Sequence, residues 1–529
     1  MDDYETLLGV PSHLAAAGVR LEGTDEARRT QALPLARQPK TGDHLRFIFR
    51  ARLLRGSELT FGFGRAMAEA THEKSSPSFQ LSLLADGTLA YRVNDKPSTI
   101  LDLTHTTGEW QHYGLDYVVG ADLVLVTVGR HQLTVPTQPG AINRVILTAD
   151  KGNSAGEFDG LRGAVVIEPG MRVLPVFGSI RWTRSDLPFI APGPKAGVSG
   201  AGFSAVAAHL YHVGGFIPIG DETTDAGRRT SRFAYQYEPA RKAWTRLPDL
   251  PARREYGVSA SSATTLYFAG GARQQPKPYT PAADLWALDL TRDDPAWRAL
   301  PSLTVPRTHL AFELLGDHLI AAGGNEYDFA AKGYGPTTIR DTVEVLDLNA
   351  LSAGWKRVAP MPPPSRGWTA AVAARGKLFL FGGLTFQSTG PERSGTKKTR
   401  LRETLVLDLE SNRWTSRTPP PCAVSGWRAA LYRDRYAILI GGTLDTGTPP
   451  AYRWNAQPLV YDTITDTWYR LDASATPPGG VYNDPGVAVV GSTLFVAGGE
   501  AIAAHYNTLL TGEIVPHWGD PPPPGSTAR

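Results

Sequence analysis

The sequence contains very little cysteine: Cys422 is the single one among 529 residues. An intramolecular disulfide framework and a Cys-rich zinc site are therefore excluded. Long apolar runs are also missing, and no stretch approaches the roughly 20 residues that a membrane-spanning helix needs. Basic charge is not in surplus, because 54 Lys and Arg nearly balance 51 Asp and Glu. We therefore expect neither a nucleic-acid partner nor a membrane span.

The first residues, Met1 to Glu5, lack the basic and apolar segments of a secretory signal. This predicts a cytoplasmic protein, unless a signal peptide was trimmed, in which case a periplasmic or secreted location is expected. A chain of this length exceeds one hydrophobic core, so we expect two or more domains. Glycine (55) and proline (42) are frequent, which favours short strands joined by turns.

A glycine pair that follows an apolar run recurs six times, at intervals of 53 to 59 residues. The pairs are Gly214-Gly215, Gly270-Gly271, Gly323-Gly324, Gly382-Gly383, Gly441-Gly442 and Gly498-Gly499. A tryptophan recurs with the same spacing, at Trp182, Trp244, Trp297, Trp355, Trp414 and Trp468. A period of this size is typical of solenoids and propellers.

Between the glycines and the tryptophan lies an apolar strand that ends in Asp-Leu, as in Leu285–Leu290 and Val343–Leu348. These combined elements resemble the kelch repeat. The resemblance implies an all-β fold in which four-stranded blades stack radially, because one blade alone cannot bury both faces. We expect a six-bladed kelch β-propeller over residues 173–517, followed by a Pro-rich tail over 518–529.

The repeat is out of phase at its two ends. Trp182 precedes the first glycine pair, and no tryptophan follows Gly498-Gly499 in phase. The last blade therefore lacks an outer strand from the C-terminal side, and we expect Val176 to Trp182 to supply it. That closure pairs two sheet edges that would otherwise be exposed.

Before residue 173 the pattern changes to alternation, as in Phe47, Phe49, Ala51 and Leu53. Several such strands predict a β-sandwich over residues 41–172, after an N-terminal extension over residues 1–40. The segments around Phe79, Trp110 and Phe158 resemble the concanavalin A-like (laminin-G-like) fold. That resemblance implies a lectin-type domain, and a non-binding accessory sandwich is the open alternative.

Arginine recurs just before the expected innermost strands. Arg253, Arg307 and Arg366 lie 17, 16 and 16 residues before their glycine pairs, and Arg428 occupies a similar segment. In a kelch propeller, the loops that enter the innermost strands and the loops after the glycine pairs lie at one face, around the mouth of a central funnel. Several arginines at this mouth would attract a carboxylate or sulfate. The alternative is that each arginine binds backbone carbonyls between blades.

Aromatic residues accompany these arginines. Trp368, Trp427 and Trp454, with Tyr256 and Tyr482, stand near the expected mouth. Flat rings beside polar groups suit the apolar face of a pyranose, and packing between blades is the alternative. The loops after the glycine pairs, at 216–232, 272–283, 325–340, 384–402 and 443–457, are long and polar, as binding loops often are.

Carboxylates are expected at the same mouth. Glu326 directly follows a glycine pair, and Arg340 closes the same loop. A glutamate beside arginines can exchange a proton with a sugar hydroxyl or ring oxygen, and a solvated loop carboxylate is the alternative. The other candidates are Asp221, Glu222, Glu403, Asp445, Asp484 and Glu500.

The six-blade count resembles the N-acetylneuraminate epimerase (sialic acid mutarotase) family. The resemblance implies an isomerase that uses glutamate and arginine, without cofactor or metal, on an acidic or neutral carbohydrate. The catalytic candidates are Glu326, Arg340, Arg402 and Glu403. The substrate-binding candidates are Arg253, Arg307, Arg366, Trp368, Trp427, Arg428 and Trp454.

Other functions stay open at this point. A non-catalytic scaffold that binds a glycan or a protein through the propeller face is as plausible as the enzyme. A sandwich followed by a kelch propeller also resembles galactose oxidase in outline, but that family has seven blades and a Cys–Tyr crosslink, and Cys422 has no evident partner. A uronate polysaccharide lyase with His309 as its base is a further alternative. In each case we expect a monomer.

Overall fold

The computed structural model describes residues 4–6, 19–22, 29–34, 44–64, 79–93, 98–118, 123–128, 131–136, 144–149, 154–166, 174–186, 198–216, 230–273, 280–327, 337–388, 396–445, 452–455, 457–471, 483–501, 504–505 and 508–517. The fold of these residues is nearly all β, as predicted, with a short 3-10 turn η2 (Leu351–Ala353). The predicted Pro-rich tail and most of the extension and of the post-glycine loops lie outside them. Contacts divide the chain into two compact units, mainly Met1–Arg172 and Val173–Arg529.

The first unit contains two antiparallel sheets. The seven-stranded sheet has β1 (Tyr4–Thr6), β13 (Ala155–Val166), β4 (His44–Arg55), β9 (Gln111–Val118), β10 (Leu123–Val128) and β11 (His131–Pro136) in this order, with β2 (Val19–Glu22) also on β13. The six-stranded sheet has β3 (Arg29–Pro34), β12 (Arg144–Ala149), β5 (Glu58–Gly64), β6 (Phe79–Leu84), β7 (Thr88–Arg92) and β8 (Thr99–Thr104).

Alternating residues of these strands build one core between the two sheets. Phe49 of β4 stacks on Phe61 of β5 with ring centroids 4.3 Å apart, and both side chains are buried. The β6–β7 turn is closed by Asp86, whose carboxylate accepts the backbone N–H of Thr88 at 2.9 Å, and Gly87 takes a left-handed φ of 84°. The alternation in the sequence therefore describes the core strands of this unit correctly.

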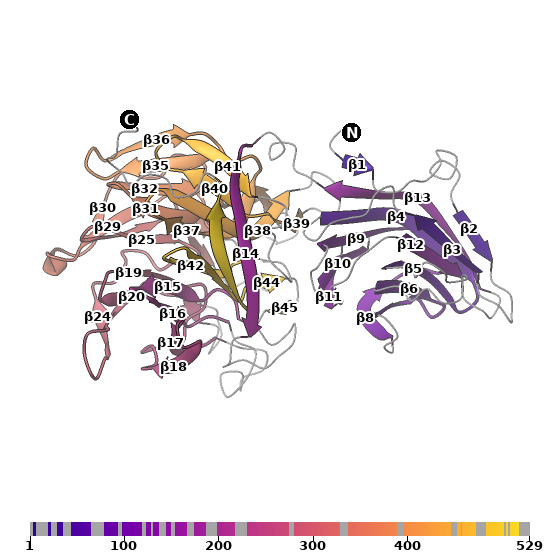
Figure 1. Ribbon diagram of the computed structural model, residues 1–529, viewed down its shortest axis with the longest axis horizontal. Helices are drawn as coiled ribbons and strands as arrows, with labels where there is room; N and C mark the ends of the chain where they lie inside the picture. The colour runs from indigo at the N-terminus through magenta and orange to yellow at the C-terminus, as the bar shows by residue number, and fades with distance from the viewer. Residues whose placement is uncertain are drawn as a thin grey trace. The chain divides into compact units, whose positions relative to one another are not determined.

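The second unit contains four-stranded antiparallel sheets, four of them separate and two joined (Figure 1). The separate sheets are β15 (Gly202–Val206), β16 (His209–Val213), β17 (Ala234–Glu238), β18 (Ala243–Leu247); β19 (Val258–Ser261), β20 (Thr265–Ala269), β23 (Leu285–Asp289), β24 (Trp297–Leu300); β25 (Ala311–Leu315), β26 (His318–Ala322), β29 (Val343–Asp347), β30 (Lys356–Arg357); and β31 (Ala370–Ala374), β32 (Lys377–Phe381), β35 (Thr404–Asp408), β36 (Arg413–Arg417). The joined pair is β37 (Val424–Tyr432), β38 (Tyr436–Asp445), β40 (Leu459–Asp462), β41 (Thr467–Leu471) and β42 (Gly486–Val490), β43 (Thr493–Ala497), β46 (Thr508–Pro516), β14 (Val176–Asp186). Short strands follow the glycine pairs: β21 (Ala272–Arg273), β22 (Thr280–Pro281), β27 (Asn325–Tyr327), β28 (Thr337–Ile339), β33 (Leu384–Ser388), β34 (Thr396–Arg400), β44 (Glu500–Ala501) and β45 (Ala504–His505), besides β39 (Tyr452–Trp454).

These sheets are arranged as a propeller. The innermost strands β15, β19, β25, β31, β37 and β42 contact one another in that order, and β42 contacts β15 again. The apolar clusters lie between neighbouring sheets, and one of them joins Phe203 and Leu210 of the first sheet to Phe495 and Leu509 of the last. Stacking therefore buries faces that a single sheet would leave exposed.

The ring closes between the two ends of the repeat region. Strand β14 pairs antiparallel with β46 over nine residue pairs, and Trp182 lies opposite Gly512. Strand β46 in turn pairs with β43, which directly precedes Gly498-Gly499. Figure 1 shows β14, in purple, alongside yellow C-terminal strands. The predicted closure by Val176–Trp182 is thus confirmed by the strand register.

The glycine pairs and the pre-strand arginines are linked through the backbone. The N–H of Gly271 donates to the carbonyl of Arg307 at 3.0 Å, and the N–H of Gly324 donates to that of Arg366 at 2.9 Å. A Cβ on Gly323, whose φ is 62°, would lie 2.4 Å from the Arg366 carbonyl oxygen. Only glycine allows this close approach between neighbouring sheets.

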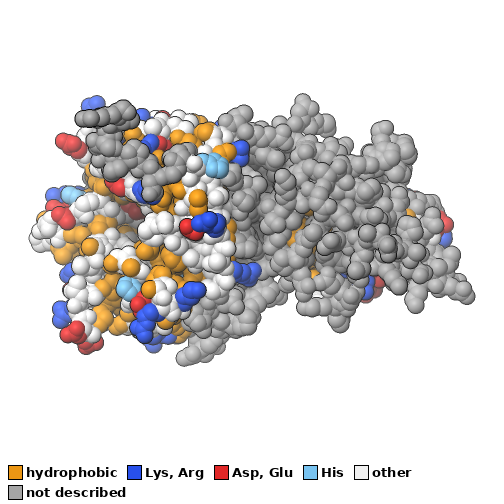
Figure 2. Space-filling view, viewed as in Figure 1, with side chains coloured by type: hydrophobic (Ala, Val, Ile, Leu, Met, Phe, Trp, Pro, Cys, Tyr) orange, Lys and Arg blue, Asp and Glu red, His pale blue; other side chains and the backbone are white. Residues whose placement is uncertain are grey.

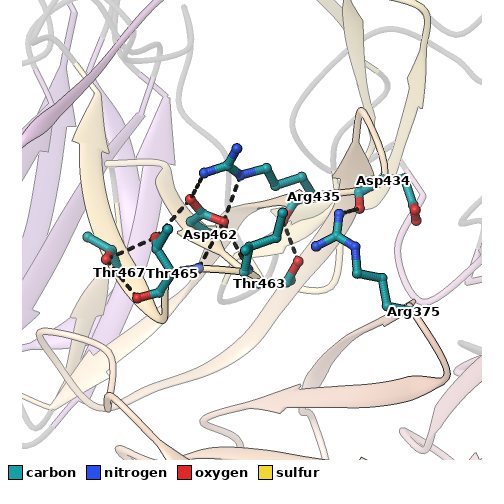
Figure 3. A network of polar contacts seen from close by, with 8 residues as sticks. Arg375, Asp434, Arg435, Asp462, Thr463, Thr465 and Thr467 are labelled. Carbon is teal, nitrogen blue, oxygen red and sulfur yellow. Dashed lines mark hydrogen bonds and ion pairs between the residues drawn. The ribbon is translucent and has the colours of Figure 1, made fainter. Parts of the chain in front are cut away.

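Polar side chains secure the turns at the opposite end of the strands (Figure 3). Arg435 binds Asp462 in a bidentate pair, with N–O distances of 2.9 and 2.6 Å, and Asp462 also accepts the backbone N–H of Ile464. In the turn between β31 and β32, Arg375 donates to the carbonyl of Asp434 in the next sheet at 2.5 Å. The pair of Arg435 and Asp462 thus fixes turns within one sheet, whereas Arg375 joins two consecutive sheets.

The recurring tryptophan has a polar role besides packing. The indole N–H of Trp355 donates at 2.8 Å to the carbonyl of Pro301, which follows the outer strand of the preceding sheet. Trp297, Trp414 and Trp468 make the same kind of bond to Pro248, Ala359 and Thr418. At four sheet boundaries the recurring tryptophan therefore supplies one hydrogen bond to the preceding sheet.

Replacing one of these indoles tests that role. Because Trp355→Phe keeps a ring and removes the donor, we expect the free energy of unfolding to fall by about 1–2 kcal/mol. Urea unfolding of wild type and variant at one pH measures the difference. An unchanged midpoint would show that ring packing alone accounts for the spacing.

Candidate functional site

The centre of the propeller carries a closed ring of backbone hydrogen bonds. It is built by one residue from each sheet, two positions after the pre-strand arginine where that arginine is present. Each ring residue donates its N–H to the carbonyl of the ring residue before it, over 2.7 to 3.4 Å, and the first donates to the last. All have left-handed φ values between 50° and 72°. The ring residues are Gly200, Tyr256, His309, Trp368, Gly426 and Asp484.

Glycine is the unstrained residue for such a conformation, yet four ring positions carry side chains. A non-glycine residue in the left-handed region costs on the order of 1 kcal/mol. Strain of this kind clusters at functional sites, where the surrounding structure enforces it. The side chains of Tyr256, His309, Trp368 and Asp484 are therefore the natural centre of a candidate site.

Three of these side chains form a continuous stack. The ring centroids of Tyr256 and His309 are 4.2 Å apart, and those of His309 and Trp368 are 4.0 Å apart. His309 is buried, and its Nδ1 lies 2.9 Å from the Thr308 hydroxyl. Burial holds the pKa of His309 well below its usual range, with Arg428 adding to the effect. The imidazole is therefore neutral near pH 7.

The other side of the ring is acidic. Arg428 pairs with the buried carboxylate of Asp484 at 2.5 Å, while burial raises the pKa of Asp484. Glu500 accepts hydrogen bonds from Ser199 at 2.9 Å and from the Tyr256 hydroxyl at 3.2 Å. Burial and the neighbouring Asp484 raise the pKa of Glu500 to about 7. Glu500 can thus both accept and donate a proton near neutral pH.

Beneath the ring lies an axial channel of about 90 Å³, lined by residues of all the innermost strands. Glu313 and Arg428 are the charged residues among those that line it. Burial raises the pKa of Glu313 to about 8. The channel therefore holds a carboxyl that is largely protonated at pH 7.

Two of the predicted anion-binding arginines are buried instead. Arg307 is 0% exposed and binds Glu344, the carbonyl of Gly323 at 3.0 Å and that of Thr342 at 2.9 Å. Arg366 is 1% exposed and binds Glu403 at 2.8 Å. Neither guanidinium lines the mouth, because each is directed into its own sheet. They bind carbonyls as the alternative interpretation had it, but within a sheet rather than between blades.

The structural equivalent of Arg307 in the preceding sheet is Arg254 rather than Arg253. Arg254 is buried and pairs with Asp284, and its carbonyl accepts the N–H of Gly215. Arg253 is partly exposed. Arg428, 23% exposed, is the predicted arginine that both lines the channel and borders the ring.

The predicted aromatic residues differ in how far they are exposed. Trp368 belongs to the ring and is partly exposed, whereas Trp427 is 0% exposed and donates its indole N–H to the Phe381 carbonyl at 3.0 Å. Trp427 is therefore a packing residue, which corrects its assignment to sugar binding. The side chain of Trp454 and the whole of Tyr482 lie outside the described residues.

The predicted catalytic residues lie in two separate pairs. Glu326 on β27 forms an ion pair with Arg340, which follows β28, and both side chains are about a third exposed. Glu403 is held by Arg366, and the exposed Arg402 donates its Nε–H to the Pro420 carbonyl at 2.7 Å. Glu326 follows the glycine pair of the third sheet and Glu500 that of the sixth, so the two lie on opposite sides of the ring.

The sequence pointed to Tyr256, Trp368, Asp484 and Glu500 as mouth residues but not to the ring that orders them. A shared offset of two residues after Arg254, Arg307 and Arg366 was the available signal. Glu313 was missed altogether. Its signal is a single carboxyl within the apolar run Leu310–Leu315.

Other features of the described residues bear on the alternatives. No helix among them is long and apolar enough to cross a membrane. Within that same part of the chain, no group of three or more His, Cys, Asp and Glu is placed to hold a metal. Burial raises the pKa of the Cys422 thiol to about 12, so it stays protonated. On the propeller surface in view, acidic and basic side chains are interspersed (Figure 2).

Comparison with known proteins agrees with this architecture. Residues 309–517 match the family model described as the KLHDC2/KLHL20/DRC7 Kelch-repeats domain. The chain thus carries kelch repeats folded as a β-propeller.

Individual relatives are similar over part of their length. Kelch-like protein terF of Aspergillus terreus is 26% identical over 270 residues, covering 50% of this chain and 53% of that protein. N-acetylneuraminate epimerase of Brucella melitensis is 29% identical over 203 residues, covering 32% and 47%. Human Kelch-like protein 34 is 26% identical over 231 residues, covering 41% and 33%. The chain therefore spans about half the length, or less, of these relatives.

Proposed function

We propose that the protein binds a carbohydrate at the ring end of a six-bladed propeller and speeds exchange between its anomers, as a sialic acid mutarotase does. The observation that carries this proposal is Glu500, a carboxyl with a pKa near 7 that accepts a hydrogen bond from Tyr256. Tyr256 belongs to the ring of backbone hydrogen bonds, whose residues have left-handed φ values. The similarity to proteins named N-acetylneuraminate epimerase supports it over part of the chain.

The chemistry needs a proton moved between the anomeric hydroxyl and the ring oxygen of the sugar. A group with a pKa near the working pH carries out both transfers best. Glu500 would accept the proton from the hydroxyl and return it to the ring oxygen, with the Tyr256 hydroxyl orienting its carboxylate. An arginine would hold the sugar carboxylate, and Arg340, Arg402 and Arg253 are the candidates, since Arg307 and Arg366 are buried.

The finer features of the fold belong to the same proposal. The six four-stranded units and the cyclic order of the innermost strands support six blades. The seven- and six-stranded sheets of the first unit support a concanavalin A-like sandwich, but they include β1, β2 and β3, so the sandwich begins within the segment expected as an extension and before residue 41. A lectin-type role for that sandwich, with an acidic or neutral glycan as ligand, is part of the proposal.

Anomer exchange of N-acetylneuraminate, followed by proton NMR, tests the activity. Glu500→Gln keeps the shape and hydrogen bonds of the side chain but carries no titratable proton, so we expect the exchange rate to fall about 10²-fold. Glu326→Gln is the matched comparison, because Glu326 is the residue that the sequence alone indicated for the proton transfer. Its effect should be smaller than that of Glu500→Gln.

The outcomes separate the possibilities. A larger loss in Glu326→Gln would move the proton transfer to the pair of Glu326 and Arg340. Anomer exchange with the wild-type protein that is no faster than in buffer alone would rule out the proposed enzymatic activity.

A non-catalytic scaffold is the second candidate. The burial of Arg307 and Arg366 favours it, because their charges are neutralised inside the sheets and add little to attraction at the mouth. Thermal stabilisation by a panel of acidic and neutral glycans, without anomer exchange, would support this function.

A further inference from the structure

The outward face of the seven-stranded sheet carries an exposed tryptophan among charged side chains. Phe49 and Ala51 of β4 are buried in the core, so Arg50 and Arg52, which alternate with them, lie on the outward face. Their guanidinium carbons lie 5.4 and 4.7 Å from the centroid of the Trp110 indole. Trp110 is still 37% exposed, so a ligand can reach it.

The polar groups beside the indole are held in place by the sheet. Arg52 donates its Nε–H and Nη2–H to one carboxylate oxygen of Glu157, at 2.9 and 2.7 Å. Glu157 is the residue paired with Arg52 across β13 and β4. The two side chains are 30% and 18% exposed, so a ligand on the indole can also reach this fixed ion pair.

The charges at this place are balanced. Asp159 is paired with Arg50 in the same ladder that pairs Glu157 with Arg52. These four residues bring no net charge and attract an anion only weakly. A carboxylate or sulfate needs donors alone, whereas a sugar hydroxyl both donates and accepts hydrogen bonds. The ion pair of Arg52 and Glu157 offers both kinds of group, which suits a neutral sugar.

The flat indole restricts the shape of that sugar. A pyranose buries apolar area on an aromatic ring through its C–H groups, and an axial hydroxyl on the same face would hold the two rings apart. β-Glucopyranose has no axial hydroxyl, so both of its faces are clear. A β-linked glucan therefore fits the indole better than a sugar with axial substituents.

We propose that the outward face of β13, β4 and β9, three neighbouring strands in Figure 1, binds a neutral β-linked glucan. One pyranose ring lies on Trp110, and its hydroxyls bind Arg52 and Glu157. This inference rests on the proposed lectin-type role of the sandwich and gives that role a site. It does not depend on anomer exchange, which uses Glu500.

Isothermal titration of the full chain with cellotetraose tests the proposal. Trp110→Ala should weaken binding about tenfold, because it removes the aromatic contact, and Trp110→Phe, which keeps a ring, should lose less. Glu157→Gln should weaken cellotetraose binding about threefold. The same change should strengthen binding of trigalacturonate, an acidic ligand, because it leaves Arg52 without its carboxylate.

Two variants of exposed residues provide matched controls. Arg55→Met breaks a more exposed ion pair with Glu22 at the end of the same strand and should bind cellotetraose as wild type does. Ile100→Ala removes another exposed apolar side chain, 58% exposed, from the six-stranded sheet and should also leave binding unchanged. The thermal unfolding midpoint of each variant shows whether it is folded.

Three results would overturn the proposal: no saturable binding of cellotetraose to the wild-type protein, equal affinity in folded Trp110→Ala, or tighter wild-type binding of trigalacturonate than of cellotetraose. Anomer exchange of N-acetylneuraminate, measured on the same samples, separates this site from the enzyme. Cellotetraose binding that depends on Trp110 in a protein without exchange would keep this site and rule out the enzyme. Exchange without cellotetraose binding would overturn this site alone.

Discussion

Replacing Arg307 by alanine should lower the free energy of unfolding by about 3–5 kcal/mol, because it leaves the buried Glu344 carboxylate without its counter-ion. Both side chains are 0% exposed, and the guanidinium also satisfies the carbonyls of Gly323 and Thr342. The variant loses these bonds together. Burial lowers the pKa of Arg307, whereas the Glu344 carboxylate raises it. The buried ion pair is therefore stable only when both side chains are charged.

Urea unfolding monitored by tryptophan fluorescence suits this measurement, because eleven of the 12 tryptophans follow residue 173. The control is Arg340→Ala, which breaks a partly exposed ion pair with Glu326 and should cost about 1 kcal/mol or less. A double variant, Arg307→Met with Glu344→Leu, should recover most of the loss, since apolar pairs replace buried ion pairs well. Equal losses in Arg307→Ala and Arg340→Ala would contradict the structural role given to Arg307.

The same arginine shows what the sequence could predict and what it could not. Spacing placed Arg307 and Arg366 at equivalent positions, and they are equivalent. Spacing does not determine where a long side chain points, and both point into their own sheets. A usable signal was present, because each arginine has its glutamate 37 residues downstream, at Glu344 and Glu403.

Backbone features were more predictable than side-chain sites. The glycine pairs and the phase of the tryptophans indicated the sheets and the closing strand, because close backbone approach and strand pairing repeat with the chain. The ring at the centre depends on left-handed backbone conformations of residues such as His309 and Trp368. The intrinsic backbone preferences of these residue types disfavour that conformation. Tertiary hydrogen bonds impose them, so the sequence alone did not distinguish this ring from other mouth residues.

Replacing the Glu313 carboxyl is the second change for which we expect a large effect on the free energy of unfolding. Glu313→Gln should stabilise the protein at pH 8 by about 2–4 kcal/mol and should have little effect at pH 4. Burial raises the pKa of Glu313 to about 8 in the folded state, whereas an unfolded glutamate titrates near its ordinary value of about 4.3. Between these two values the folded protein binds more protons than the unfolded chain. Wild-type stability therefore falls with rising pH across this window, and glutamine removes that loss.

Urea unfolding of wild type and Glu313→Gln from pH 4 to pH 8.5 measures the difference directly. The raised pKa of Glu500 acts in the same direction in both proteins, so it cancels in the difference. Asp317→Asn, on the exposed turn of the same hairpin, should give a difference from wild type that barely changes over the range. If the gap between Glu313→Gln and wild type stayed constant from pH 4 to pH 8.5, Glu313 would have to be ionised in the folded protein at neutral pH, which would contradict its raised pKa.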